Sequence, residues 1–419
     1  MISRNACYWI WITLSIGYNN PKVKRISEMY SDVSAFYYGG ISEWHLCGIF
    51  SQKDLERFSS TGLDDAKKIV DRCIECNYSI LCIDDELFPK CLYNIECPPA
   101  LIYVNGVMPD IDNTFSIGIV GTRRATKYGI ENSYRFAYAL SKYGTIIVSG
   151  GALGVDGASH RGALATDGIT ICVRGCGLNC SYLRENLDIR STIPKRGAVI
   201  TEYPPDETPR NYYFPARNRI IAALSDGLLV MEAGKKSGSL ITANLAAEQG
   251  KTIFALLGNN SPQNEGSNAL IKEGLAIPVT DFMDILCEFD SLYATTDDEF
   301  DIDNISLADT GNFPVKGIRK QAPARIYVNK QNDRQPAKTA VPYVSEKSET
   351  VVQKPVHKEN LNLPKTVQDV YEYIGNEPVH IDKISADLKI PVFKVLTALT
   401  MLEMKDLVSA LQGRNYILK

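Results

Sequence analysis

The chain has 419 residues, and because a single hydrophobic core stops growing at about 250–300 residues, we expect two or three domains. Its 45% hydrophobic and 22% charged residues can fill real cores, which excludes wholesale disorder. The formal net charge of −4 excludes a protein that is basic throughout, so a site for nucleic acid has to be local.

The chain opens with an apolar run from Ala6 to Gly17. This run contains Trp9 and Trp11, shows no Ala-x-Ala-like cleavage pattern and is too short to span a bilayer. We therefore expect the amphipathic first helix of a small domain, in a cytoplasmic protein without a membrane segment.

Helical patterns continue after this run, for example over 51–58 and 64–75, and predict a small N-terminal helical (SAM-like) domain over residues 1–108. From residue 109 to 288, short β-branched runs alternate with helical stretches. The strand candidates are Ser116–Val120, Thr145–Val148, Thr170–Val173, Ala198–Thr201, Gly227–Met231 and Thr252–Leu257. Continuous apolar strands between helices predict an α/β domain with a doubly wound parallel sheet, covered on both faces.

The remaining chain divides into two further parts. Residues 289–363 are acidic at first and then rich in Lys, Ser and Pro, which predicts a disordered linker. Helical pattern returns at 366–374, 380–388 and 392–401, followed by strand-like runs at 407–411 and 416–418. Three short helices and a terminal hairpin predict a winged-helix-type domain over 364–419.

The cysteine and histidine pattern does not indicate a metal or a disulfide framework. Eleven cysteines are scattered through a long chain, and the four histidines do not cluster. The pair Cys73 and Cys76 has no second Cys-x-x-Cys partner at zinc spacing. We expect buried free thiols, and neither a metal nor a cofactor.

Glycines follow five strands of the central domain. They are Gly121, then Gly150, Gly151 and Gly154, then Gly175 and Gly177, and finally Gly234 and Gly258. The carboxyl ends of parallel strands meet at one edge, where helix N-termini present N–H groups and positive dipole ends, so this edge is predicted to bind phosphate. Five adjacent loops suit a phosphate-bearing chain better than one nucleotide. The alternative is that these glycines only make tight turns.

Polar side chains suited to phosphate accompany these loops. They are Thr122 and Arg123, Ser149, Arg217 and Asn218, and the run Lys236, Ser237, Gly238 and Ser239. Arginine and lysine neutralise phosphates, whereas hydroxyl and backbone N–H groups position them. Phe214 precedes the Arg217 cluster and offers a face on which an unpaired base can stack, with core packing as its alternative role.

Catalysis has little support. Asp156, His160, Glu202 and Glu232 are candidate acid–base groups, but no nucleophile motif or matched Cys/His pair accompanies them. We expect Asp156 to be a helix N-cap and His160 to pack on the same helix, so no catalytic residue is predicted. The loops also lack the nicotinamide-binding G-x-G-x-x-G pattern and the Walker motif.

Several motifs occur together in the central domain. They are IVGTR at 119–123, SGGALGVD at 149–156 with HRGAL at 160–164, TEYPP at 201–205, FPARNRII at 214–221 and SGSLITA at 237–243. Their order and spacing over about residues 115–280 closely resemble the signature series of the DprA/Smf (DNA-processing) family. Arg174 departs from the family pattern, which usually has an aliphatic residue there.

The resemblance implies an extended Rossmann fold that binds single-stranded DNA in a basic pocket. It also implies a homodimer that is not an enzyme and that loads the RecA recombinase during natural transformation. One alternative is a Rossmann-like nucleoside-monophosphate N-glycosidase, although Lys235 and Lys236 stand where such enzymes have glycines. A pure protein-interaction scaffold is a third reading, but it does not explain the basic residues beside the glycine loops.

Overall fold

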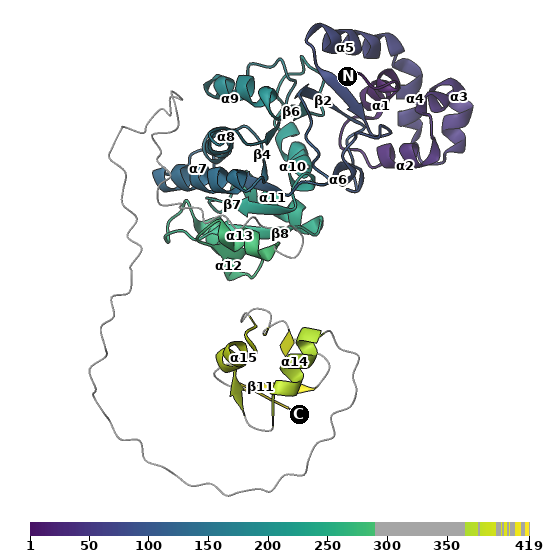
Figure 1. Cartoon of the computed structure of the whole chain (residues 1–419). Helices are drawn as coiled ribbons and strands as arrows, with labels where there is room; N and C mark the ends of the chain where they lie inside the picture. The colour runs from purple at the N-terminus through teal and green to yellow at the C-terminus, as the bar shows by residue number, and fades with distance from the viewer. Residues whose placement is uncertain are drawn as a thin grey trace, which may run out of the picture. The chain divides into compact units, whose positions relative to one another are not determined.

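The computed structural model describes residues 1–289 and most of 365–418, with gaps at 376–377, 391–394, 396–397, 400–401, 403–406 and 412–414. The described residues fall into two compact units, 1–289 and the described part of 365–418 (Figure 1). The predicted linker, residues 289–363, lies outside the described residues except for Phe289. The predicted division at residue 108 remains a proposal.

Five helices begin the first unit. They are α1 (Ala6–Ile16), α2 (Lys22–Met29), α3 (Val33–Leu46), α4 (Gln52–Ser60) and α5 (Leu63–Glu75). Helix α1 is not amphipathic as predicted, because its consecutive residues Trp9, Ile10, Trp11 and Ile12 are all buried. It lies among α3, α4, α5 and the first strand, and therefore buries most of its surface. No described helix combines the length and the apolar character that crossing a membrane requires.

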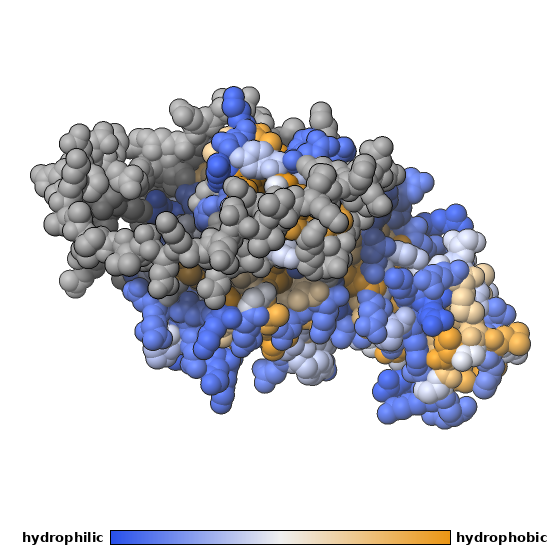
Figure 2. All heavy atoms as spheres, turned by 90° about the horizontal axis from the view of Figure 1, so that it is seen from below, coloured by the Kyte–Doolittle hydropathy of each residue, from blue (hydrophilic) through white to orange (hydrophobic). Residues whose placement is uncertain are grey.

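Helix α3 leaves apolar side chains on the surface. Gly40 interrupts it with a φ of 63°, and Tyr38, Ile41 and Leu46 are exposed around this break. Figure 2 shows apolar residues gathered at the end of the molecule that holds these N-terminal helices.

A nine-stranded sheet forms the centre of the first unit. Its strands are β1 (Ser79–Cys82), β2 (Leu101–Gly106), β3 (Ser116–Val120), β4 (Ile146–Ser149), β5 (Thr170–Val173), β6 (Ala198–Thr201), β7 (Gly227–Val230), β8 (Thr252–Leu256) and β9 (Ile277–Val279). They lie in the order β1-β2-β6-β5-β4-β3-β7-β8-β9, and all pairs from β6 to β9 are parallel. The doubly wound parallel sheet is therefore confirmed. Strands β1 and β2, which the sequence did not predict, extend it with antiparallel pairs.

The parallel strands are buried on both faces, as their continuous apolar runs predict. In β4, Ile146 and Val148 belong to one hydrophobic cluster, whereas Ile147 between them belongs to a second. The first cluster includes residues of α10 (Tyr213–Ala223) and α11 (Gly238–Glu248). The second includes residues of α7 (Lys127–Lys142) and α8 (Val155–Leu164), so two helical layers enclose the sheet (Figure 1).

The remaining α-helices of the first unit are short. They are α6 (Lys90–Tyr93), α9 (Leu187–Thr192), α12 (Glu265–Lys272) and α13 (Met283–Glu288). The order of the strands in the sheet places β3 in the middle of the parallel part, with β4, β5 and β6 on one side and β7, β8 and β9 on the other. Strands β3 and β7 therefore flank the switch point, beside which ligands bind in folds of this type.

The second unit contains α14 (Lys365–Tyr373), β10 (Val379–His380), α15 (Ile381–Leu388), β11 (Val408–Leu411) and β12 (Asn415–Leu418). Its three strands lie in the order β10-β12-β11, and both pairs are antiparallel, which confirms the predicted terminal hairpin. Of the predicted third helix, only Val395, Ala398 and Leu399 are described, and each is helical and buried.

Candidate nucleic-acid interface

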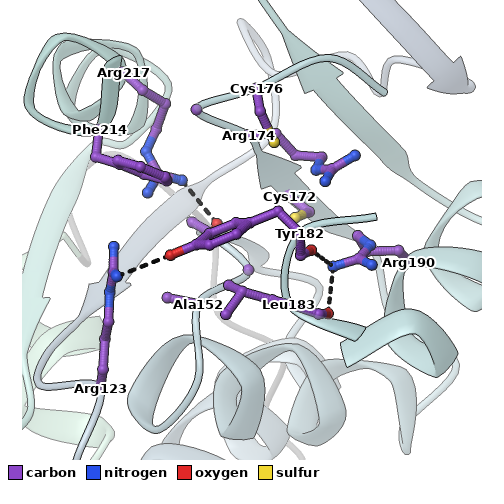
Figure 3. A pocket seen from close by; sticks show the side chains of 13 residues that line it. Arg123, Ala152, Cys172, Arg174, Cys176, Tyr182, Leu183, Arg190, Phe214 and Arg217 are labelled. Carbon is purple, nitrogen blue, oxygen red and sulfur yellow. Dashed lines mark hydrogen bonds between the residues drawn. The ribbon is translucent and has the colours of Figure 1, made fainter. Parts of the chain in front are cut away.

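A small pocket lies where the carboxyl ends of β3, β4 and β5 meet the start of α10 (Figure 3). Six of the predicted site residues line it together: Arg123, Gly150, Gly151, Gly175, Phe214 and Arg217. The other lining residues are Ala152, Cys172, Arg174, Cys176, Tyr182, Leu183 and Arg190. Four arginines and no carboxylate therefore line the pocket, which favours an anion. Its volume of about 20 Å³ accommodates one water-sized group.

The glycine loop after β4 forms one wall of the pocket. Gly151 and Gly154 have φ values of 65° and 77°, a backbone region that side chains other than glycine rarely adopt. The N–H of Ala152 donates to Oδ2 of Asp156 at 3.2 Å. The prediction that this loop presents free N–H groups is therefore wrong at Ala152.

The carbonyl groups of the same loop are also bound within the protein. Nδ2 of Asn186 donates to the carbonyl oxygens of Gly151 and Ala152, at 3.2 and 2.9 Å. The loop is consequently a rigid scaffold, and the positive charge of the pocket comes from arginine side chains rather than from a nest of backbone N–H groups.

Asp156 lies beneath this loop and is buried. It is not the N-cap of α8 as predicted, because Gly154 occupies that position and Asp156 belongs to the first turn. Burial raises the pKa of Asp156, and the positive charge of Arg217 opposes this shift. The carboxylate thus orders the loop and provides a negative charge near Arg217.

Arg217 projects from α10 and is 5% exposed. Its Nη1 donates to the carbonyl oxygens of Gly150, at 2.8 Å, and Val173, and its Nε donates to Oδ1 of Asn218 at 3.2 Å. Burial lowers the pKa of Arg217, and the charge of Asp156 opposes this effect. Nη2 has no hydrogen-bond partner among the described residues. Arg217 therefore links α10 to the ends of β4 and β5 and still contributes to the pocket lining.

Arg123, Phe214 and Tyr182 meet at the mouth of the pocket (Figure 3). The exposed guanidinium of Arg123 lies 5.2 Å from the centroid of the Phe214 ring, and its Nη1 donates to the Tyr182 hydroxyl at 3.2 Å. The Tyr182 and Phe214 ring centroids are 5.5 Å apart, with an interplanar angle of 46°. This arrangement places a cation and two aromatic rings together at the entrance, which is a combination suited to a phosphate and its base.

The pocket lining includes two further arginines, which the sequence analysis did not propose as site residues. Arg174 donates to the carbonyl oxygens of Gly177, Leu178 and Cys180 at 2.7–2.8 Å. Arg190 donates to those of Tyr182 and Leu183, both at 2.8 Å. Arg174 was noticeable as a departure from the family pattern, whereas no motif surrounds Arg190.

The other predicted residues around the pocket support its walls. The hydroxyl of Ser149 donates to the Ile119 carbonyl at 2.6 Å, and the N–H of Thr122 donates to that of Glu232 at 2.8 Å. Gly121 and Gly175 are needed for close packing, since a Cβ atom on Gly175 would lie 2.9 Å from the Phe214 ring. These residues thus position the loops, and none of their hydroxyl groups lines the pocket.

The predicted run after β7 lies apart from the pocket lining. Ser237 is the N-cap of α11, and its hydroxyl bonds that of Ser239 at 2.8 Å. Gly238 begins the helix, and the exposed Lys236 has no ion-pair partner among the described residues. Because β7 adjoins β3 in the sheet, these residues lie on the same edge as the pocket and on the far side of the switch point.

The candidate acid–base groups are buried and bound. Oε2 of Glu232 accepts hydrogen bonds from the backbone N–H and the hydroxyl of Thr126, at 2.9 and 3.1 Å. Oε1 of Glu202 forms an ion pair with Nη2 of Arg219 at 2.7 Å. His160 is packed on α8 as predicted, and burial lowers its pKa to about 3. All eleven cysteines are free thiols, four of them buried, and the described residues contain no cluster of potential metal ligands.

Two family models match the chain. The model of DNA recombination-mediator protein A matches residues 79–290, and that of the DprA winged helix domain matches residues 358–414. The chain is 39% identical to the protein Smf of Escherichia coli over 212 residues, which are 50% of this chain and 56% of that protein. It is 32% identical to the protein Smf of Synechocystis over 346 residues, which cover 81% of this chain and 80% of that protein.

A solved structure gives the same result. DNA processing protein A from Streptococcus pneumoniae is 31% identical and aligns with a TM-score of 0.59, over 67% of this chain and 97% of that chain. The extended Rossmann-like fold and the winged-helix-type C-terminal domain are thereby confirmed.

Proposed function

Because this chain belongs to the DNA recombination-mediator protein A (DprA/Smf) family, we propose that it binds single-stranded DNA at the pocket above β3, β4 and β5. The observation that carries the proposal is the composition of that pocket, which combines four arginines with two aromatic rings and no carboxylate. Arginines attract phosphates, and aromatic faces stack unpaired bases of any sequence.

The proposed contacts follow from the exposure of each group. Arg123 is exposed and binds a phosphate, while Phe214 offers its ring to the adjacent base. Arg217 contributes positive charge from the floor, with Gly150, Gly151 and Gly175 allowing the close approach of the strand. The strand then continues along the edge, past Gly121 and Thr122 and supported by Ser149 and Asn218, toward Lys236, Ser237, Gly238 and Ser239.

This site favours unpaired DNA over a duplex. A base in a double helix is stacked and paired, so moving it onto Phe214 would cost a few kcal/mol of stacking and pairing energy. A single strand has no such cost. The decisive experiment is fluorescence anisotropy with labelled single strands of about 24 nucleotides and with duplexes of the same length and sequence. Tighter binding of the single strand supports the proposal, and equal or tighter binding of the duplex contradicts it.

We also propose that the chain acts in the cytoplasm as a homodimer that helps to load the RecA recombinase onto the strand. The edge strand β9 supports a homodimer, because apolar side chains are exposed on and around it, at Leu257, Leu275, Ile277 and Met283. Substituting Leu275→Asp should halve the mass measured by light scattering, whereas Leu187→Asp, at an exposed leucine of α9, should not. An unchanged mass for Leu275→Asp would contradict this interface.

The role that we propose is binding without catalysis. Glu232, the acid–base candidate nearest the switch point, is buried and holds Thr126 through two hydrogen bonds, which is a structural task. We therefore expect no hydrolysis of nucleoside monophosphates. Turnover that disappears in Glu232→Gln would favour the N-glycosidase alternative.

A further inference from the structure

Tyr182 stands at the pocket mouth without a role in the hydrophobic core. It lies in the loop between β5 and α9 and is half-buried. Among the described residues its ring packs against the Phe214 ring, and its hydroxyl accepts a hydrogen bond from Arg123. Tyr182 therefore makes both contacts with residues that we propose bind DNA.

The backbone that carries Tyr182 is strained and held in place. The next residue, Leu183, has φ 59° and ψ 65°, a left-handed conformation that is unfavourable for a residue other than glycine. The carbonyl groups of Tyr182 and Leu183 both accept from Nη1 of Arg190. Such strain persists only where surrounding contacts maintain it, and it concentrates at functional sites.

The preceding part of this loop is also fixed. Arg174 binds the carbonyl groups of Gly177, Leu178 and Cys180. Two buried or half-buried arginines thus anchor the loop on either side of Tyr182. The freely adjustable part is the Tyr182 side chain, which can rotate about its own bonds while its backbone stays in place.

The present ring spacing leaves no room for a base. The centroids are 5.5 Å apart, whereas two rings with a third between them need about 7 Å, twice the van der Waals contact distance of about 3.5 Å. Opening requires only the loss of the contact between the rings and of one hydrogen bond from Arg123, at 3.2 Å and on the exposed side. A modest rotation of Tyr182 therefore converts the closed pair into a slot.

We propose that Tyr182 and Phe214 form an aromatic clamp that takes one unpaired base between their rings while Arg123 moves from the Tyr182 hydroxyl to the phosphate. This inference rests on the proposed function, and it adds the requirement that the ligand present a base as well as phosphates. Arg190 is then a positioning residue that presents Tyr182, and it does not need to touch the strand.

The test compares two ligands that differ only in their bases. One is a labelled strand of twelve thymidylates, and the other is a strand of the same length in which every sugar is an abasic tetrahydrofuran. The dissociation constants of both are measured for the wild-type chain, Tyr182→Ala and Tyr182→Phe. Tyr212→Ala is the matched control, because Tyr212 is an exposed tyrosine at the N-cap of α10 that does not line the pocket.

The clamp predicts a selective effect. Tyr182→Ala should bind thymidylate about tenfold more weakly, the size of one lost stacking contact, and should bind the abasic strand as the wild type does. Tyr182→Phe keeps the ring and should stay near the wild-type value, as should Tyr212→Ala. Unchanged binding of the abasic strand also shows that Tyr182→Ala is folded.

Three results would overturn the clamp. Tighter binding of thymidylate by Tyr182→Ala would show that Tyr182 plugs the site, and unchanged binding would show that it has no role. An equal loss for both strands would show that Tyr182 acts only by placing Arg123. By contrast, a wild-type chain that binds neither strand would contradict the proposed function itself.

Discussion

Nη1 of Arg217 lies 2.8 Å from the carbonyl oxygen of Gly150 and also donates to the carbonyl oxygen of Val173. A single guanidinium from α10 thereby joins the ends of β4 and β5. Removing the arginine would take this donor away from both carbonyl groups. Arg217 is therefore as much a structural residue as a binding residue.

The first prediction concerns stability at this position. Arg217→Ala should lower the free energy of unfolding by about 3 kcal/mol, because it removes charge-assisted hydrogen bonds and leaves buried carbonyl groups unpaired. Urea unfolding followed by circular dichroism measures this loss. Arg124→Ala, at an exposed arginine that follows Arg123 in the chain, is the control and should change stability by less than about 0.5 kcal/mol. Equal stabilities for the two variants would show that Arg217 does not anchor the loop.

The buried ion pair between Glu202 and Arg219 gives a second prediction. Nη2 of Arg219 lies 2.7 Å from Oε1 of Glu202, and both side chains are at most 6% exposed. Glu202→Gln should destabilise the protein by about 3–5 kcal/mol, because it leaves a buried guanidinium without its counter-charge. The double variant Glu202→Met/Arg219→Met should be more stable than the sum of the two single changes predicts. Additive losses would show that the two charges do not depend on each other.

The burial of His160 leads us to predict that the free energy of unfolding falls in weak acid. Nδ1 of His160 lies 2.8 Å from the Thr170 hydroxyl, which itself donates to the Ile147 carbonyl, so the histidine carries its proton on Nδ1. Nε2 is buried without a partner among the described residues. Burial lowers the pKa of His160 to about 3, whereas an unfolded histidine has a pKa of about 6.5.

The sign of the effect follows from this difference. Below pH 6.5 the unfolded chain binds a proton that the folded chain excludes, so the free energy of unfolding falls as the pH falls toward 3. By pH 5 the loss attributable to His160 is about 2 kcal/mol. His160→Asn, whose amide can still donate to Thr170, should lack this component, so its stability relative to the wild type should improve between pH 7 and pH 5. A constant difference over this range would contradict the assignment.

The parallel strands could be predicted because burial on both faces produces continuous apolar runs, and the predicted bounds of β3, β5 and β6 match the structure. Strands β1 and β2 could not be predicted in this way. They are placed by a distant pairing, in which Tyr103 lies opposite Thr201 of β6, and no local pattern specifies such a pair. The same holds for α1, since the partners that bury most of its surface come from later helices and strands.

The candidate site was predictable where its residues directly follow a strand in the sequence. Arg123, Gly150 and Gly175 belong to loops that the alternation of strands and helices places at one edge. Tyr182 and Arg190 were not predictable, because they reach the pocket through an irregular loop whose course depends on hydrogen bonds to its own backbone. The N–H group of Ala152 in the β4 loop was misassigned for a related reason, since its acceptor, Asp156, faces inward only once the loop has folded.

The salt dependence of single-strand binding by the wild type and Arg123→Ala tests the central claim most directly. Each phosphate that a side chain neutralises on a single strand contributes about 0.7 to the slope of log affinity against log salt concentration. The Arg123 guanidinium is exposed and its hydrogen bond is on the surface, so its removal should leave the melting temperature unchanged. We predict that Arg123→Ala binds strands of every sequence more weakly and flattens the slope by about 0.7. An unchanged slope, with or without a lowered melting temperature, would contradict the account.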